Sequence, residues 1–194
     1  MKKIILIFVI TFSITCKSQV TVELPLGTYE YPNGAYLKDL NNELLPYVGT
    51  WKGVLNNKEY TFVFQKFTQH LSAYPNGGSY NYRDEIKGKL KVVDLTTNIT
   101  LYDNLSATNY DDFLIYGVSK PYSGMFEFIF TDTDANCNNS LSFTLRNING
   151  QPNQLTYCYF KYDDWWKSWD CPNYSNRMSI PVNLPMEEFV LIKQ

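Results

Sequence analysis

Histidine is nearly absent from this sequence of 194 residues, and His70 is its single copy. A Ser-His-Asp triad, a Cys-His pair or a histidine-rich zinc site would each depend on that one side chain. None of the usual nucleophile or zinc motifs surrounds it. We therefore predict a surface role for His70, and we expect no metal, no cofactor and no enzymatic activity. Hydrolysis by a pair of carboxylates stays open as an alternative, because two acids suffice for it.

Long hydrophobic runs are also scarce. The one candidate, residues 4–14, is too short to span a bilayer, which needs about 20 apolar residues. Lys2 and Lys3 precede it and Cys16-Lys17-Ser18 follows it, an order typical of a signal peptide. We expect residues 1–18 to be an export signal, the mature protein to be secreted or periplasmic, and no transmembrane segment to be present.

Two cleavage sites compete at the end of this signal. Cys16 could be the lipid-bearing first residue of a lipoprotein, or the chain could be cut after Ser18. Lipoprotein signals usually carry Leu three residues before the cysteine and a small residue directly before it, whereas Ser13 and Thr15 stand here. This mismatch favours ordinary cleavage. Membrane association, as an outer-membrane lipoprotein, is expected only if Cys16 is lipidated.

Clusters of basic residues are absent as well. Loss of residues 1–18 removes three lysines and no acid, which leaves 14 basic against 19 acidic groups and a net charge of −5. Because phosphate binding needs a basic face, we expect no nucleic-acid partner.

Aromatic residues are abundant, at 16% of the chain, and they favour strands over helices. Nine segments have strand character, and no helical pattern lies between them. Turn residues such as Asn56-Asn57 and Asn149-Gly150 join them through short loops, so successive strands should be antiparallel. The segments are residues 49–55, 60–67, 80–93, 98–102, 113–118, 125–131, 141–147, 155–162 and 188–193.

The alternation of apolar and polar residues differs among these segments. Residues 141–146 alternate cleanly, which predicts one buried and one exposed face. Residues 113–116 are apolar or aromatic on both faces, so protein or a ligand must cover the second face. A closed meander explains both patterns and removes exposed edges. We predict an all-β fold, an antiparallel up-and-down barrel of about 8 to 10 strands, closed or nearly closed, as one domain over residues 36–194.

The region before the first of these strands has two parts. Residues 19–35 are punctuated by proline and glycine, which predicts an extended N-terminal arm. Apolar residues then recur at roughly helical spacing, although Pro46 limits a helix to a turn or two. We expect a short helical turn directly before the barrel. The apolar positions with this spacing are Leu37, Leu40, Leu44, Leu45 and Val48.

The run Leu44-Leu45-Pro46-Tyr47-Val48-Gly49-Thr50-Trp51 resembles the start of a lipocalin, where a short helix leads into the first strand through Gly-x-Trp. In that family the tryptophan plugs one end of the barrel, and the other end binds small hydrophobic molecules. The resemblance implies these structural roles for Gly49 and Trp51. The family's Thr-Asp-Tyr is faintly matched by Thr108-Asn109-Tyr110, and Lys193 is the candidate for its late arginine.

A second resemblance covers most of the chain. The run Tyr36-Leu37-Lys38-Asp39, with Asn41-Asn42 ahead of Gly49-Thr50-Trp51, is similar to small exported bacterial proteins known only as domains of unknown function. It implies export and brings no activity with it.

Cysteine pairing follows from the expected hairpin of residues 141–147 and 155–162. Cleavage after Ser18 leaves Cys137, Cys158 and Cys171 in an oxidising compartment, so one of the three must be left over. A hairpin centred on residue 151 brings Cys137 level with about residue 165 and places Cys158 several residues away along its strand. We predict a disulfide between Cys137 and Cys171, with Cys158 buried and free.

The same register gathers acidic residues and tryptophans at one end of the sheet. Trp165, Trp166 and Trp169 would lie beside Asp132 and its neighbours, in the Trp-rich loop 163–171. This loop begins a long irregular stretch, residues 163–183, that is too aromatic for disorder. Tryptophan faces beside carboxylates suit a sugar ring, a cation or an apolar ligand, and they equally suit packing of the loop onto the barrel. An EF-hand is excluded at residues 132–143 because glycine and glutamate are missing from the required positions; a looser calcium site stays open.

Two functional hypotheses follow. The first is a non-enzymatic, lipocalin-like protein that binds a small hydrophobic molecule inside the barrel, unless the interior is simply filled with side chains. The second is a cell-surface interaction module that recognises carbohydrate or a partner protein through the tryptophan segment. Candidate residues lining the interior are Phe62, Phe64, Phe126, Phe128 and Phe130.

Overall fold

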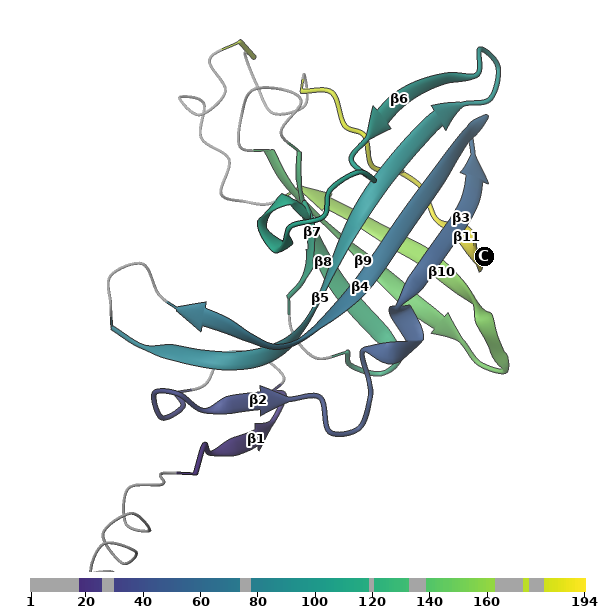
Figure 1. Cartoon of the computed structure of the whole chain (residues 1–194). Coiled ribbons are helices and arrows are strands. Elements are labelled where there is room, and N and C mark those ends of the chain that lie inside the picture. The colour runs from purple at the N-terminus through teal and green to yellow at the C-terminus, as the bar shows by residue number, and fades with distance from the viewer. Residues whose placement is uncertain are drawn as a thin grey trace, which may run out of the picture.

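The computed structural model describes residues 18–25, 30–73, 78–118, 121–132, 139–162, 173–174 and 180–194, with backbone alone at 132, 139 and 159–162. This part of the chain forms eleven strands and two single turns of 3-10 helix (Figure 1). In chain order they are β1 (Thr21–Glu23), β2 (Tyr36–Lys38), η1 (Leu45–Tyr47), β3 (Gly49–Leu55), β4 (Lys58–Ala73), β5 (Tyr80–Asp94), β6 (Ile99–Asp103), η2 (Tyr110–Asp112), β7 (Ile115–Gly117), β8 (Met125–Asp132), β9 (Asn139–Ile148), β10 (Gln151–Tyr162) and β11 (Phe189–Lys193).

Eight of the strands form a closed antiparallel barrel. β3, β4, β5, β7, β8, β9, β10 and β11 pair in chain order, and β11 pairs back onto β3. The closing pair sets Ile192 opposite Lys52 and Lys193 opposite Trp51. The predicted all-β barrel is confirmed, and so are the antiparallel meander and the helical turn at η1.

β4 and β5 are longer than the barrel requires. Pairing of β4 with β3 ends where Phe64 meets Gly49, while pairing with β5 continues to Ala73 and Tyr80. The projecting hairpin carries two additional strands, because β2 pairs with β5 and β1 pairs with β2, both in parallel (Figure 1). Leu37 therefore lies in a strand, and the expectation that it begins a helical repeat is wrong: long-range pairing with Arg83 overrides the local spacing.

Alternation along β5 separates an inner face from an outer one. Ile86, Gly88 and Leu90 are buried, whereas Lys87 and Lys89 between them are only partly covered. On the outside, the Lys87 ammonium donates to the Tyr110 carbonyl at 2.8 Å, and the Lys89 ammonium to the carbonyls of Leu105 and Ala107 at 2.8 and 2.9 Å. These lysines fasten the β6–β7 connection to the barrel wall.

The hairpin of β9 and β10 has the predicted register. Leu155 pairs with Asn147 and Tyr157 with Leu145, which centres the hairpin on residue 151. Cys158 follows on β10 and is buried at 8% exposure with its thiol free, as predicted. The predicted disulfide between Cys137 and Cys171, which would leave Cys158 unpaired, lies outside the described residues.

Candidate functional site

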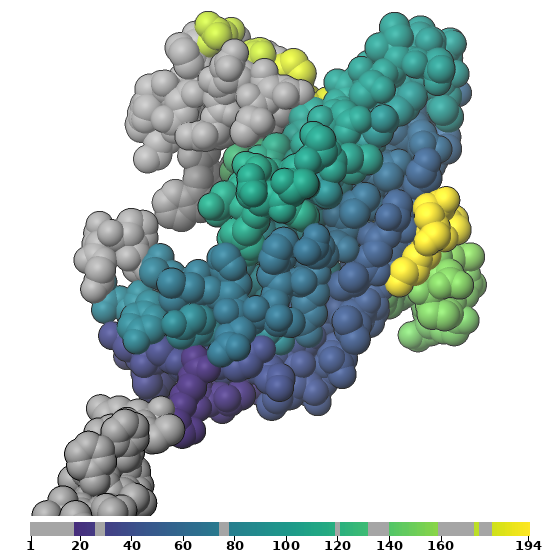
Figure 2. All heavy atoms as spheres, in the orientation of Figure 1, coloured from purple at the N-terminus to yellow at the C-terminus, as the bar shows by residue number. Residues whose placement is uncertain are grey.

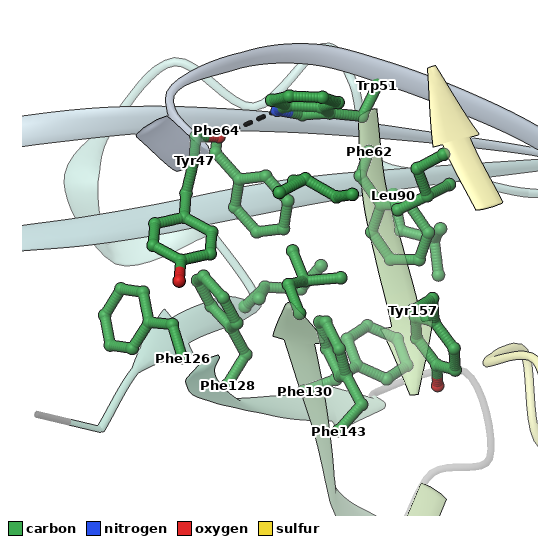
Figure 3. Packing of buried hydrophobic residues seen from close by; sticks show 14 of the residues in the cluster. Tyr47, Trp51, Phe62, Phe64, Leu90, Phe126, Phe128, Phe130, Phe143 and Tyr157 are labelled. Carbon is green, nitrogen blue, oxygen red and sulfur yellow. Dashed lines mark hydrogen bonds between the residues drawn. The ribbon is translucent and has the colours of Figure 1, made fainter. Parts of the chain in front are cut away.

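One end of the barrel is plugged around Trp51. The indole is fully buried, and its Nε1–H donates to the Tyr47 carbonyl at 2.8 Å (Figure 3). On the other side the Lys193 ammonium lies 5.2 Å from the centroid of the indole ring, a cation–π distance. Gly49 has φ +127°, and a Cβ there would approach Lys193 Cε to 2.9 Å. These contacts of Gly49, Trp51 and Lys193 are compatible with a lipocalin-like barrel.

Tyr47 completes this plug from η1. Its hydroxyl donates to the Gly124 carbonyl at 3.1 Å and accepts from Asn147 Nδ2 at 3.2 Å. Its ring packs edge-on against Phe126 at 5.2 Å and Phe128 at 6.2 Å between centroids. Burial raises the pKa of Tyr47 well above its ordinary value, so this hydroxyl stays protonated and acts as a structural donor.

The interior above the plug is occupied by aromatic rings in contact with one another. All five phenylalanines expected to line the barrel point inward, and each is at most 2% exposed. Phe64 contacts Phe128 at 4.7 Å between centroids, and Phe128 contacts Phe126 at 4.5 Å (Figure 3). Phe143 and Tyr157 extend the stack at 5.1 Å. These rings form a packed core through the middle of the barrel.

The end opposite Trp51 is crossed by the segment that leads into β11. Leu184 is buried in the core cluster at 2% exposure, and Ile180 is buried at 3%. The Tyr157 hydroxyl points away from Trp51 and donates to the Pro185 carbonyl at 3.0 Å (Figure 3). Asn56 Nδ2, in the β3–β4 turn, donates to Glu187 Oε1 at 2.9 Å. Residues 180–188 therefore form a strap over this end.

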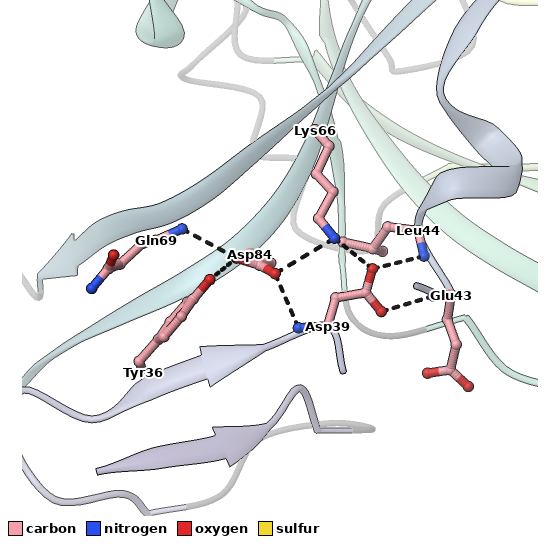
Figure 4. A network of polar contacts seen from close by, with 7 residues as sticks. All are labelled: Tyr36, Asp39, Glu43, Leu44, Lys66, Gln69 and Asp84. Carbon is pink, nitrogen blue, oxygen red and sulfur yellow. Dashed lines mark hydrogen bonds and ion pairs between the residues drawn. The ribbon is translucent and has the colours of Figure 1, made fainter. Parts of the chain in front are cut away.

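Two buried acids, Asp39 and Asp84, meet outside the barrel interior, beside the β4–β5 hairpin (Figure 4). The Lys66 ammonium lies between them, 2.8 Å from Asp39 Oδ2 and 3.5 Å from Asp84 Oδ2. Asp84 also accepts from the Tyr36 hydroxyl at 2.6 Å and from two backbone N–H groups, those of Asp39 and Gln69. Asp39 accepts from the N–H groups of Glu43 and Leu44. We call this group, Tyr36, Asp39, Lys66 and Asp84, the carboxylate clasp.

The protonation of the clasp follows from these contacts. Burial by itself would raise the pKa of Asp84, but hydrogen bonds from Tyr36, Asp39 and Gln69 and the charge of Lys66 together lower it below its ordinary value. Burial first, and then the hydrogen bond to Asp84, raise the pKa of Tyr36 to about 12. Every carboxylate oxygen already accepts a hydrogen bond or ion pair, so the clasp is built to join β2, β4 and β5.

His70 lies on the outer face of the hairpin and is partly covered. Its ring stacks on Tyr110 at 3.5 Å between centroids, and the Lys87 ammonium lies 3.7 Å from the centroid of the same Tyr110 ring. The Tyr110 hydroxyl donates to Glu85, and Phe67 packs edge-on against Tyr110 at 5.0 Å. His70 therefore helps to anchor η2 against the barrel, which agrees with the surface role that we predicted.

Several predicted residues lie outside the described part of the chain: Cys16, Cys137, Trp165, Trp166, Trp169 and Cys171. Asp132 ends β8, but its side chain is not described. In the described ranges, no three His, Cys, Asp or Glu side chains gather in a way that could hold a metal ion. The described residues also include no helix with the length and apolar character needed to cross a bilayer.

Two features escaped the sequence reasoning. The carboxylate clasp joins residues up to 48 positions apart, and no local pattern marks Asp39 or Asp84 as partners. The second feature is the row of lysines on the outer face of β5. It did carry a signal in the sequence, since Ile86, Gly88 and Leu90 alternate strictly with lysines. That alternation predicts a strand with one buried and one exposed face, but it does not mark the β6–β7 connection that the lysines hold.

Comparison with known proteins identifies the family of the chain but no activity. No curated protein matches it, and no solved structure does. One family model matches the whole chain, residues 1–194, and its description is "Family of unknown function (DUF6705)". The lipocalin-like features at Gly49 and Trp51 thus occur in a chain that belongs to the DUF6705 family of unknown function.

Proposed function

We propose that this protein is an exported, non-enzymatic binding module that recognises carbohydrate or a partner protein on its outer surface. The observation that carries the proposal is the packed interior. Phe62, Phe64, Phe128 and Phe143 contact one another across the barrel, with centroids 4.7 to 6.0 Å apart. Side chains in contact occupy this part of the interior, so a ligand there would have to displace them.

The sequence supplies a recognition element for such a surface. Trp165, Trp166 and Trp169 follow β10 in a stretch that also contains Asp163, Asp164 and Asp170. Indole faces stack on the apolar faces of sugar rings, and neighbouring carboxylates accept hydrogen bonds from sugar hydroxyls. Tryptophan is also among the residues most enriched at the centres of protein interfaces.

Carriage of a small hydrophobic molecule is the second candidate, favoured by the closed barrel and its Trp51 plug. A ligand entering from the other end would have to displace the strap of residues 180–188. It would then meet Tyr60 and Phe189, which are 6% and 8% exposed and whose tilted rings lie 5.6 Å apart between centroids. The ligand would therefore lie near that end of the interior.

A two-part binding experiment separates these functions. The protein is titrated with the apolar dye N-phenyl-1-naphthylamine and, separately, screened against immobilised glycans and envelope polysaccharide. We expect glycan or cell-surface binding that the triple change W165A/W166A/W169A abolishes. The control Tyr122→Ala, which removes a 66% exposed aromatic ring elsewhere, should leave binding intact. Saturable dye binding that Phe189→Leu weakens and Phe126→Leu does not would replace this proposal with internal carriage.

Absence of catalysis is part of the proposal, and it is supported by the state of the clasp. Among the described residues, Asp39 and Asp84 are the buried acids, and their oxygens are taken by Tyr36, Lys66 and backbone N–H groups. A general acid or base needs an oxygen within reach of a substrate proton. Hydrolysis of chromogenic glycosides that Asp84→Asn abolishes, without loss of fold, would contradict this part.

Export is tested by the mass of the mature chain. Expression with residues 1–18 intact, followed by fractionation, should give a protein that begins at Gln19 outside the cytoplasm. The Cys16→Ser variant should be processed in the same way. An acylated Cys16 in the wild type, lost with membrane association in Cys16→Ser, would identify a lipoprotein instead.

A further inference from the structure

The chain contains three Asn-Gly pairs, at residues 33–34, 76–77 and 149–150. Asparagine is a chemically labile residue. It is most open to attack before glycine, because glycine has no side chain to shield its backbone nitrogen from the neighbouring carboxamide. The pair at 76–77 lies outside the described residues, and the other two pairs have different surroundings.

Asn149 and Gly150 form the two-residue turn between β9 and β10. Both are exposed, and Ile148 pairs with Gln151 directly beside them. Gly150 has φ +75°, and a Cβ at this position would meet nothing within 4 Å. Among the described residues, neither the Asn149 carboxamide nor the Gly150 N–H has a hydrogen-bond partner. In Figure 2 this turn projects at the lower right, in light green.

The turn is also separated from the buried core. The register of β9 and β10 shifts between Gln151 and Leu155, so regular pairing resumes at Leu155, opposite Asn147. Pro152, within this irregular stretch, has no N–H to donate to β9. A change in backbone length at Asn149 can therefore be absorbed before it reaches buried side chains.

The same dipeptide is held in place at residues 33–34. The Gly34 N–H donates to the Tyr80 carbonyl at 3.0 Å, and Asn33 Oδ1 accepts from the Tyr80 N–H at 3.2 Å. The glycine nitrogen and the asparagine carboxamide are thus both bound to the start of β5. Reaction between them requires these hydrogen bonds to break first.

We propose that Asn149 is a deamidation site of the folded protein and that Asn33 is protected by its contacts with Tyr80. The Gly150 nitrogen attacks Asn149 Cγ: an N–Cγ bond forms, the Cγ–Nδ2 bond breaks, and ammonia leaves with the proton from the Gly150 nitrogen. Water then opens the cyclic imide. Attack of water at Cγ gives aspartate, and attack at the backbone carbonyl carbon of residue 149 gives isoaspartate.

No atom is oxidised or reduced in these steps, and water is the one co-reactant. Either product has a carboxylate in place of a neutral amide, so the net charge of residues 19–194 changes from −5 to −6. Isoaspartate also adds one methylene group to the backbone of the turn. The proposal does not depend on the ligand that the protein recognises.

Peptide mass mapping during storage in mildly alkaline buffer tests this site. The protein is the chain from Gln19 with Asn76→Ser, which removes the third pair. We expect conversion at Asn149 to be at least about tenfold faster than at Asn33 in the folded protein. In concentrated urea the contacts of Asn33 are lost, and the two sites should react at similar rates.

Ion-exchange chromatography gives a second readout, because the converted protein is more acidic. Asn149→Ser should remove the acidic form, and the matched control Asn33→Ser should leave it unchanged. Circular dichroism confirms that both variants are folded.

Three results would overturn the proposal. One is an Asn149 that stays intact in the folded protein. Another is conversion of Asn33 at the same rate as Asn149 under native conditions. The third is a preference for Asn149 that persists in urea, since the neighbouring sequence and not the fold would then cause it.

Discussion

The ammonium of Lys193 lies 5.2 Å from the centroid of the Trp51 ring, and the two residues face each other in the pair that closes the barrel. This contact joins the end of β11, the last barrel strand, to Trp51 on β3, the first. The buried indole offers one side to the cation and donates its N–H to Tyr47.

Replacement of Lys193 by Met should lower the free energy of unfolding by about 0.5–2 kcal/mol, because the aliphatic stem remains and the cation–π contact is lost. Lys193→Arg should retain most of the stability. Urea denaturation measures both. The control is Lys52→Met on the outer wall, where the ion pair with Glu59 is solvent-exposed and is expected to contribute under about 1 kcal/mol. Equal effects at the two lysines would rule out a special role for the plug contact.

Replacement of Lys66 by Met should be far more damaging. It leaves the carboxylates of Asp39 and Asp84 buried without their cation, and loss of one partner from a buried ion pair typically costs about 3–5 kcal/mol. Lys91→Met is the matched control, since its pair with Asp103 is about one third exposed on both sides. Urea denaturation at pH 7 should give a loss under about 1 kcal/mol for the control. Similar losses of unfolding free energy in Lys66→Met and Lys91→Met would show that the clasp does not stabilise the fold.

The clasp also predicts how stability depends on pH. The pKa of Asp84 is lower in the folded protein than in the unfolded chain, so its contribution is present above the unfolded pKa and is lost as pH falls through the folded pKa. Wild-type stability should therefore fall below about pH 4. Asp84→Asn should be less stable at pH 7 and should lose less between pH 6 and pH 3. Thermal melts followed by circular dichroism would refute this if the two pH curves ran parallel.

Gly88 on β5 lets the ring of Phe64, its pairing partner on β4, lie close to the backbone. A Cβ at this position would lie 2.6 Å from two ring atoms of Phe64, which is buried among other aromatic rings. Gly88→Ala should destabilise by about 1–3 kcal/mol through overpacking. Addition of Phe64→Leu should cost less in the Gly88→Ala background than in the wild type, and a double-mutant cycle measures this coupling. Gly78→Ala, where the new Cβ meets nothing within 4 Å, is the control.

Thiol titration of the mature protein tests the cysteine pairing. Cys158 is buried, and its sulfur lies 3.6 Å from Thr144 Oγ1, so it should not react with 5,5′-dithiobis(2-nitrobenzoate) in the native state. Without reductant, denaturation should release one thiol per chain if Cys137 and Cys171 are bridged. Three thiols would show that no disulfide forms.

The barrel could be read from the sequence because its signals are local. Residues 49–55 were predicted as a strand with the same bounds as β3, and the Asn-Gly turn at residues 149–150 fixed the register of β9 and β10. Period-two alternation and turn residues lie within a few positions of the strands that they define. The Gly-x-Trp motif likewise marked Trp51, which is fully buried in the structure.

What the sequence did not reveal depends on contacts between distant segments. β1 and β2 have three residues each, and Leu37 becomes part of a strand only because β5 offers an edge beside Arg83. The clasp requires the bulge that presents the Gln69 N–H to Asp84. Neither the pairing of β1 and β2 nor the clasp depends on propensity or periodicity. The single sequence therefore carried no signal for them.

The closing pair of β3 and β11 has a consequence for how the chain is made. β3 is the first barrel strand in chain order and β11 is the last, so every other barrel strand must be synthesised before the two can meet. Until then the inner face of β3, with Trp51 on it, lacks the neighbour that covers it. The nascent chain therefore cannot complete its barrel ahead of β11, and the step that seals the fold waits for the last barrel strand to be made.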